Sequence, residues 1–402
     1  MALFTDPLHD EFAGLAAAWV TAGAFDYGEV LAIADAFPDG GDDADFFDAW
    51  SGAGDRHVER AESALAAGHG ETAQGHLFRA AACFGVAIKP WFGSPVDRRM
   101  TEGFAKCTEA FDRAIGMGPS PAERLAVAFD GYEMAGWFLP ARDSTPGERR
   151  PVVIVVNGYD GTLPENYFGL GKAATDRGYH AVLFDGPGQG SLLVDEGIPM
   201  SPDWDRVVSA VIDAIVDRDD VDAGRIALHG WSLGGYLAPR AAAGEPRVAA
   251  VVADPALWGI IDGMRGLVTA LGSPELAAGL PDLPDDAAAT ITKAIESDRG
   301  LTWRVIKRGY WVHGVDDFQG YLRAVTPFTL TGHAENIRCP LLGTTTEGDP
   351  LSAGARDFLA RLSCPTTLLE FTAAEGAGGH CEIQNRWLLN TRVLDWLDET
   401  LG

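Results

Sequence analysis

The chain has 402 residues, of which 47% are hydrophobic and 22% charged, so it is long enough for two domains or for one domain with large insertions. Its net charge of −27 argues against a nucleic-acid partner, because phosphate binding requires a basic surface. It has no run of 18 apolar residues to span a membrane, no basic segment typical of a signal peptide at the N-terminus, and five scattered cysteines without C-x-x-C pairs. We therefore expect a cytoplasmic protein with no membrane association, no disulfide framework and no zinc site.

Residues 1–121 are predicted to form an N-terminal helical cap domain. The segment 61–87 has the alanine-rich spacing, with leucine and phenylalanine, that suits amphipathic helices, and a further helix fits 99–115. The stretch 117–121, rich in glycine and proline, indicates a linker to the next domain.

Residues 122–402 are predicted to form a catalytic domain in which strands alternate with helices. Two strands at 125–129 and 133–139 flank Asp130-Gly131 and predict a β-hairpin. Such alternation predicts an α/β fold with an eight-stranded, mostly parallel sheet and helices on both faces. The six further strands are expected at 151–156, 180–184, 225–229, 248–252, 341–345 and 367–371, and the helices at 166–176, 204–217 and 385–401.

The predicted sixth strand is followed by a long interruption, at about 255–337. Its pattern is helical, and it is far longer than an ordinary connection between a strand and a helix. We expect a helical lid that lies over the strand ends and encloses the site together with the N-terminal helices.

The pentapeptide Gly230-Trp231-Ser232-Leu233-Gly234 carries the most chemical information. It lies between the strand at 225–229 and a helix-like run from Tyr236, which is the setting in which G-x-S-x-G presents a nucleophilic serine. Glycine at 230 and 234 lets the backbone turn tightly and pass close to its neighbours. The pentapeptide alone is a weak signal, and an ordinary turn between strand and helix is the alternative.

A nucleophilic serine needs an adjacent base, and the base needs an acid that orients it. In α/β-hydrolases these residues follow in the order serine, acid, histidine, and His380 is the one histidine beyond the seventh predicted strand. Asp349 opens the loop after that strand, whereas the competing Glu347 would lie within the strand end. An aspartate before proline also suits a simple turn, but the joint order favours Ser232, Asp349 and His380 as a triad.

Two backbone N–H groups are expected to form an oxyanion hole, those of Leu233 and of Tyr159 in the loop after the third strand. A second glycine-rich loop, 185–190, lacks the features of a phosphate-binding loop and is interpreted as a tight turn that borders the pocket. We therefore expect no cofactor and no metal. His313 and His333 lie in the predicted lid, where surface roles are favoured over substrate contacts.

Four segments together resemble one branch of the α/β-hydrolases: 184–190, 157–160, 230–235 and 375–382. That branch contains 2,6-dihydroxypseudooxynicotine hydrolase, the fermentation-respiration switch protein family and fungal pigment hydrolases that shorten polyketides. The resemblance covers 122–402 and extends more weakly into 73–84. It implies an α/β-hydrolase fold, a serine hydrolase with a helical domain over the site, a homodimer, and cleavage of a carbon–carbon bond next to a ketone. It also implies an acidic residue from outside the triad, for which Asp262 is the candidate.

The expected substrate is a small acyl or ketone compound. Hydrolysis of a carbon–carbon bond in a β-dicarbonyl or polyketide-like compound is the first hypothesis, and a carboxylesterase or thioesterase is the alternative. A non-hydrolytic ligand-binding or isomerising role is the alternative of another class, against which an intact triad argues. Trp231, Tyr310 and Trp311 are candidate substrate contacts, although such aromatic residues serve equally well in helix packing.

Overall fold

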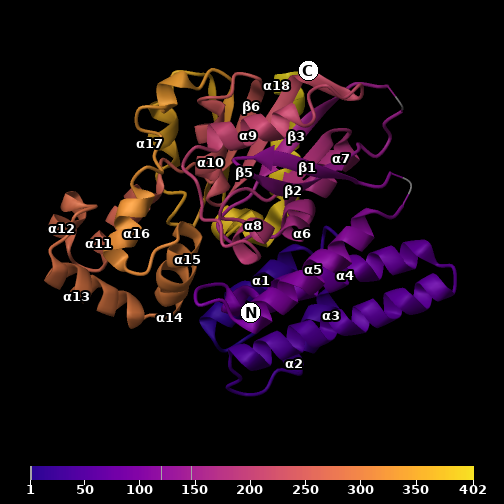
Figure 1. Cartoon of the computed structure of the whole chain (residues 1–402), viewed down its shortest axis with the longest axis horizontal. Coiled ribbons are helices and arrows are strands. Elements are labelled where there is room, and N and C mark those ends of the chain that lie inside the picture. The colour runs from indigo at the N-terminus through magenta and orange to yellow at the C-terminus, as the bar shows by residue number, and fades with distance from the viewer. Residues whose placement is uncertain (1, 119, 146) are drawn as a thin grey trace.

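An eight-stranded sheet forms the centre of the computed structural model, which describes residues 2–118, 120–145 and 147–402 (Figure 1). The strands follow the order β1-β2-β4-β3-β5-β6-β7-β8. β2 pairs antiparallel with both β1 and β4, and the remaining pairs are parallel, which confirms the predicted eight-stranded, mostly parallel sheet. The strands are β1 Glu123–Phe129, β2 Tyr132–Leu139, β3 Arg150–Val156, β4 His180–Phe184, β5 Val221–Trp231, β6 Val248–Asp254, β7 Leu341–Thr346 and β8 Thr366–Phe371.

The central strands are buried on both faces, as the continuous apolar run predicts. Side chains alternate across a strand, so Val152 and Ile154 of β3 enter one hydrophobic cluster while Val153 and Val155 enter another on the opposite face. β5 begins at Val221, earlier than predicted, because Val221 pairs with Arg150 ahead of a shift in register. Because the two clusters pack on opposite faces of the sheet, they hold the sheet in position and with it the ends of its strands.

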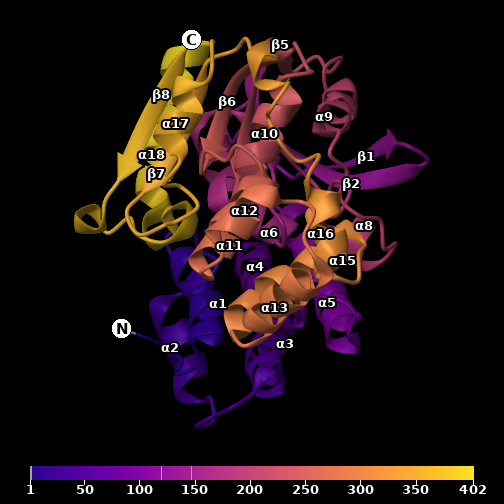
Figure 2. The same ribbon diagram turned by 90° about the vertical axis from the view of Figure 1, so that its left-hand side faces the viewer.

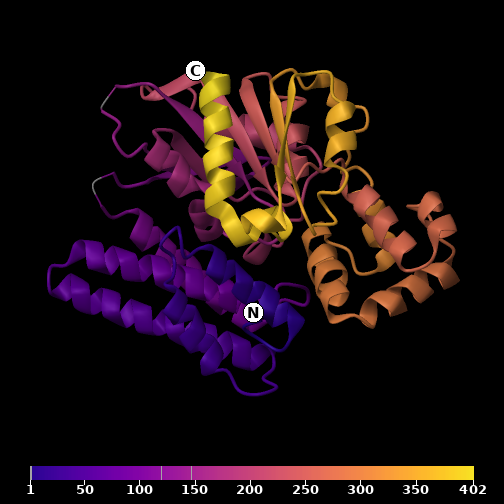
Figure 3. The same ribbon diagram turned by 180° about the vertical axis from the view of Figure 1, so that it is seen from behind.

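Helices cover both faces of the sheet, with α9 and α10 on one side and α18 on the other (Figures 1 and 3). The predicted helix at 166–176 instead begins at Leu163, because Thr162 and Glu165 form a capping box. It passes through a π-helix before ending at Arg177, and α9 ends at Asp213, short of the predicted 217. These helices are α6 Leu163–Asn166, η2 Tyr167–Gly171, α7 Lys172–Arg177, α8 Gly190–Val194, α9 Trp204–Asp213, α10 Gly234–Ala242, α17 Ala355–Ala360, η5 Ala373–Glu375, η6 His380–Asn385 and α18 Arg386–Leu401.

The N-terminal helices lie together below the sheet in Figure 1. The predicted helical stretch 61–87 is two helices, α3 and α4, and α3 begins at Asp43 behind a capping box from Asp42. The edge of the Trp19 ring meets the Trp231 ring at a centroid distance of 5.5 Å, which brings these helices against the end of β5. Across the described ranges, no helix has the length and apolar character that a bilayer crossing requires. The elements are α1 Pro7–Ala18, α2 Tyr27–Asp35, α3 Asp43–Ala66, α4 Gly70–Ala87, η1 Lys89–Trp91 and α5 Arg98–Ile115, and the predicted linker at 117–121 includes residue 119, outside the described residues.

A helical insertion separates β6 from β7 and lies beside the N-terminal helices (Figure 2). The two parts touch where the rings of Phe12 and Trp303 approach to 4.9 Å between centroids. One hydrophobic cluster runs from the N-terminal helices through a face of the sheet into this insertion. The insertion comprises α11 Ile260–Ala270, α12 Pro274–Gly279, α13 Asp285–Glu296, α14 Arg299–Leu301, the π-helix η3 Thr302–Gly309, α15 Tyr310–His313, α16 Phe318–Val325 and η4 Ala334–Asn336.

Candidate active site

Ser232 occupies a tight turn between β5 and α10. Its φ angle is +58°, in the left-handed region that costs a non-glycine residue roughly 1 kcal/mol or more. The turn is held by the Ser232 N–H, which donates to the carbonyl oxygen of Asp254 at 2.7 Å. A Cβ at Gly234 would collide with the carbonyl oxygen of Val156, so only glycine lets this turn pack against β3. The strained turn therefore presents the serine side chain at the strand end.

The structure brings the three predicted triad residues together. Ser232 Oγ lies 2.9 Å from His380 Nε2, and His380 Nδ1 lies 2.9 Å from Asp349 Oδ2. The Asp349 side chain is only 2% exposed, whereas that of His380 is 39% exposed. Glu347, the competing acid, is exposed and accepts a hydrogen bond from the N–H of Ala373 instead. The geometry therefore pairs Asp349, and not Glu347, with the histidine.

A buried charge cluster holds the loop that carries His380. Arg386 donates to Asp254 Oδ2 and to the carbonyl oxygen of Cys381, both at 2.8 Å. Burial favours the neutral acid of Asp254, but the charge of Arg386, the hydrogen bond with Glu382 and the nearby His229 together outweigh it and lower the pKa of Asp254. Burial, together with the neighbouring Asp254 carboxylate, raises the pKa of Glu382 well above its usual range, and Glu382 also contacts Thr346. Asp254, Glu382 and Arg386 thus form one buried cluster beside the loop that carries His380.

Cys381 and Glu382 both have positive φ angles, +55° and +50°, directly after His380. Consecutive non-glycine residues in this region are strained and persist only where the surroundings hold them. The contacts of Arg386 and Thr346 supply that restraint. Arg386 follows Cys381 by five positions and begins α18, whereas Thr346 comes from the end of β7.

The predicted oxyanion loop lies directly against the serine turn. A Cβ placed on Gly158 would come within 2.9 Å of Ser232 Cβ and 3.2 Å of the Leu233 nitrogen. Asn157 closes the loop on itself: its Oδ1 accepts from the Gly158 N–H at 2.8 Å, and its Nδ2 donates to the Gly161 carbonyl at 2.7 Å. In the described chain, the N–H groups of Leu233 and Tyr159 donate to no other protein atom. Both predicted donors are therefore free to bind a ligand oxygen beside Ser232.

The helical insertion contacts this loop through its polar side chains. Tyr159 Oη lies 2.9 Å from His313 Nε2 and 3.4 Å from Tyr321 Oη. Arg308 donates to Asp160 Oδ1 at 2.8 Å and stacks over the Tyr159 ring. The expectation of a surface role for His313 is wrong: its side chain is buried, and burial lowers its pKa to about 3, so it is a neutral partner of the phenol.

The N-terminal helices reach the same loop through Lys89. Its ammonium group donates to the carbonyl oxygen of Asp160 at 2.7 Å and to Glu165 Oε2 at 3.0 Å. Burial lowers the pKa of a lysine, but the charges of Glu165 and Asp160 outweigh it and raise the pKa of Lys89. The loop 157–161 is thus the point where the sheet, the insertion and the N-terminal helices meet.

The sequence also predicts substrate contacts for four residues outside the triad and the oxyanion loop. Asp262 is 44% exposed and pairs with Arg265 at 2.7 Å, and no described contact joins it to Ser232. Trp231 packs against Trp19, and Trp311 packs edge-on against Phe92 at 4.7 Å. Tyr310 is buried beside Tyr321, with a ring separation of 5.8 Å. Substrate contact by these four residues stays a prediction.

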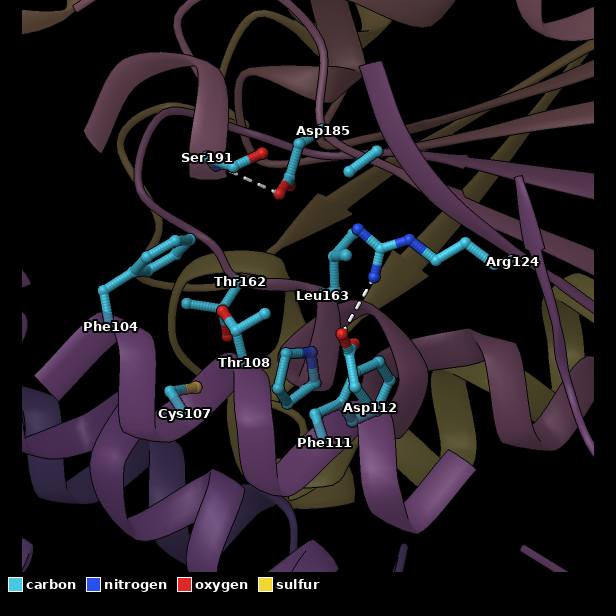
Figure 4. A pocket seen from close by; sticks show the side chains of 12 residues that line it. Phe104, Cys107, Thr108, Phe111, Asp112, Arg124, Thr162, Leu163, Asp185 and Ser191 are labelled. Carbon is cyan, nitrogen blue, oxygen red and sulfur yellow. Dashed lines mark hydrogen bonds and ion pairs between the residues drawn. The ribbon is translucent and has the colours of Figure 1, made fainter. Parts of the chain in front are cut away.

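Figure 4 shows a separate cavity of about 40 Å³ beneath the turn at 185–190. The residues that line it include Asp185 and Asp112 but no member of the triad. Small-molecule sites enclose roughly 300–1,000 Å³, so this cavity is too small to receive a substrate. Burial raises the pKa of Asp185 to about 7.

Within the ranges that the structure describes, no three His, Cys, Asp or Glu side chains are grouped to hold a metal ion.

Comparison with known proteins shows which family and fold this chain is similar to. Residues 153–385 match the model of the alpha/beta hydrolase family. Hydrolase LUC6 from Fusarium sp is 28% identical over 394 residues, which cover 93% of this chain and 92% of LUC6. The 20-hydroxy-prefusarin hydrolase FUS2 from Gibberella moniliformis is 28% identical over 397 residues, with 93% and 92% covered. The crystal structure of 2,6-dihydroxy-pseudo-oxynicotine hydrolase has the same fold, with a TM-score of 0.75 at 23% identity and with 96% and 95% of the two chains covered. The resemblance seen in the sequence motifs is confirmed.

Proposed function

The chain belongs to the alpha/beta hydrolase family and is a hydrolytic enzyme, and we propose that Ser232 is its nucleophile. His380 is the proposed general base, and Asp349 orients it. The observation that carries this proposal is the hydrogen-bonded chain from Ser232 Oγ through His380 to Asp349, with both separations 2.9 Å. A serine hydroxyl gains its reactivity from such a pair, because the base removes its proton as the bond to the substrate forms.

The proposed reaction begins with attack of Ser232 Oγ on a substrate carbonyl while His380 Nε2 takes the hydroxyl proton. The carbonyl oxygen becomes an oxyanion, which the N–H groups of Leu233 and Tyr159 stabilise by hydrogen bonds. His380 then returns the proton to the departing group, which leaves an acyl group on Ser232. Water, deprotonated by His380, cleaves that acyl-enzyme and releases an acid. The chain's own residues supply each proton transfer in this sequence.

For the substrate, we propose a β-dicarbonyl or polyketide-like ketone whose carbon–carbon bond is hydrolysed. The motif resemblance supports this chemistry, and a relative that matches over most of its length is named a hydrolase of 20-hydroxy-prefusarin. In such a compound the departing carbon is stabilised as an enolate by the second carbonyl, and it accepts the proton that His380 holds. Water is consumed, and an acid and a ketone are formed.

The test compares a β-diketone with a short p-nitrophenyl ester, using the unaltered protein and Ser232→Ala. Turnover of the diketone that falls about 10^4-fold or more in Ser232→Ala, with the fold intact, supports the proposal. Fast ester cleavage with an inert diketone assigns the site to an esterase or thioesterase, since the same triad serves both. Turnover that survives in Ser232→Ala would overturn the role of the serine.

A further inference from the structure

The turn at 185–190 contributes a side chain to the active site that the proposed mechanism does not use. Gln189 is 1% exposed and immediately precedes α8. Its Nε2 donates two hydrogen bonds, to the carbonyl oxygen of Asn157 at 2.9 Å and to that of Gly158 at 2.8 Å. Its Oε1 accepts from the Gly186 N–H at 3.1 Å. The amide therefore ties one glycine-rich turn to the loop that carries Tyr159.

These bonds determine the orientation of a specific peptide group. The carbonyl of Gly158 and the N–H of Tyr159 belong to the same peptide unit, which is planar. In a trans peptide the oxygen and the hydrogen point in opposite directions. Because Gln189 holds the oxygen of this unit, the N–H of Tyr159 is held pointing away from Gln189. Gly158 lies against Ser232 and the Leu233 nitrogen, so the fixed peptide is beside the reacting serine.

We infer that Gln189 is a positioning residue that fixes the Tyr159 N–H as an oxyanion donor. The inference rests on the proposed function, in which that N–H stabilises the oxyanion. Glutamine meets the requirement through two donors on one nitrogen and an acceptor on the adjacent oxygen. An ionised glutamate has acceptors alone, and it would face the carbonyl oxygens of Asn157 and Gly158 without a donor.

A matched pair of variants separates positioning from general stability. Gln74 Nε2 also bridges two carbonyl oxygens, those of Ala114 and Met117, at 2.9 and 3.0 Å, in the N-terminal helices. Each of Gln189→Met and Gln74→Met removes two hydrogen bonds from a side-chain nitrogen to carbonyl oxygens, beside Ser232 in one case and in the N-terminal helices in the other. Gln189→Met also removes the bond that Oε1 accepts from Gly186. The probe is an alkyl fluorophosphonate, because its phosphoryl oxygen needs the same donors when Ser232 attacks the phosphorus and fluoride leaves.

We expect Gln189→Met to lower the maximal rate of Ser232 phosphonylation by about 10^2-fold, the usual loss for one oxyanion donor. The probe concentration that gives half the maximal rate should stay unchanged, since the donor acts on the transition state. Gln74→Met should label at nearly the unaltered rate. Equal losses in the two variants, or no loss in Gln189→Met, would overturn the inference while the proposed function stands.

A second variant covers the case in which Gln189→Met does not fold. Gln189→Glu keeps the side-chain size and the acceptor for Gly186, and it regains one donor when its carboxyl is protonated. Its labelling rate, relative to the unaltered protein, should rise as the pH is lowered; a ratio that does not change with pH would count against the inference. If the unaltered protein is not labelled at Ser232 at all, the proposed function falls, and this inference with it.

Discussion

Replacing Gly158 by alanine tests how closely the oxyanion loop must approach the nucleophile. The added Cβ would lie 2.9 Å from Ser232 Cβ, 3.0 Å from the carbonyl oxygen of Trp231 and 3.2 Å from the Leu233 nitrogen. Ordinary van der Waals contact lies between 3.4 and 4 Å, so the loop must retreat by about half an ångström. The two proposed oxyanion donors, the N–H groups of Leu233 and Tyr159, lie on either side of the position where the new Cβ and Ser232 would collide. A retreat of the loop therefore moves the Tyr159 N–H away from the oxyanion.

A misplacement of about 1 Å can cost about 10^2-fold in rate, so a retreat of about half an ångström should cost about 10-fold, which corresponds to about 1.4 kcal/mol of transition-state stabilisation. The assay is kcat/KM for the best substrate from the diketone and ester comparison, measured for Gly158→Ala beside the unaltered protein. The control is Gly354→Ala, because Gly354 has an ordinary φ of −85° and an added Cβ there would meet nothing within 4 Å. If Gly158→Ala keeps kcat/KM within about threefold of the control, the assignment of the loop as an oxyanion site is refuted.

Three further predictions concern the acids and the tyrosine near the site. Asp349→Asn should lower kcat about 10^4-fold, as expected when a triad histidine loses its orienting acid, whereas Glu347→Gln should change kcat by no more than about twofold; similar losses would contradict the choice of acid. Tyr159→Phe keeps the backbone N–H and should change kcat/KM by only a few-fold. The variant leaves the buried His313 without its hydrogen-bond partner, which should lower the free energy of unfolding by about 1–3 kcal/mol. A hundredfold loss of activity would show that the phenol itself is catalytic. The pKa of Asp185 is about 7 in the folded protein and about 4 in an unfolded chain, so between about pH 4 and pH 7 only the folded state keeps the Asp185 proton. The free energy of unfolding should therefore fall as the pH rises from about 4 to about 7, by up to about 1.4 kcal/mol per pH unit. Asp185→Asn lacks this contribution, so its free energy of unfolding relative to the unaltered protein, from urea titration, should be higher at about pH 8 than at about pH 5, and a constant difference would contradict the burial argument.

The three residues of the proposed triad could be selected from the sequence because local context and chain order point to each of them. The elbow at Ser232 has its own glycines, and Asp349 and His380 follow the seventh and eighth strands in chain order. The prediction that Glu347 lies within the strand end is wrong, because β7 ends at Thr346 and leaves both Glu347 and Asp349 in the following loop. The two acids are distinguished by the contact of Asp349 Oδ2 with His380 Nδ1, which the strand boundary does not report. Local patterns such as the elbow involve only residues that are close together in the sequence, so they can be recognised before the fold is known.

The residues that surround the triad could not be predicted in the same way. His313 reaches Tyr159 across 154 positions of sequence, and Arg386 reaches Asp254 across 132. Such contacts depend on how the insertion and the last helix pack, and periodicity in one sequence does not report that packing. Lys89 illustrates the same limit, because a lone lysine in a helical region reads as a surface residue until Glu165 and Asp160 are placed around it.

Some local signals were present in the sequence and were missed. Thr162 and Glu165 form the spacing of a capping box, with Pro164 in the first turn, and they mark the true start of the helix at Leu163. Gln189 lies in the glycine-rich turn 185–190, whose glycines indicate the shape of the backbone but give no partner for the Gln189 side chain. The role proposed for Gln189 depends on the contact between this turn and the loop of Gly158, 31 positions earlier, which the sequence does not report.

The central claim is that Ser232 is the nucleophile, and covalent labelling with a fluorophosphonate tests it most directly. The labelled protein is digested, and the modified peptide is identified by mass spectrometry. We expect a single adduct on the Ser232 oxygen, absent in Ser232→Ala and formed far more slowly in His380→Gln, in which the proposed base is lost. An adduct on a different residue, or labelling that persists undiminished in Ser232→Ala, would contradict the central claim.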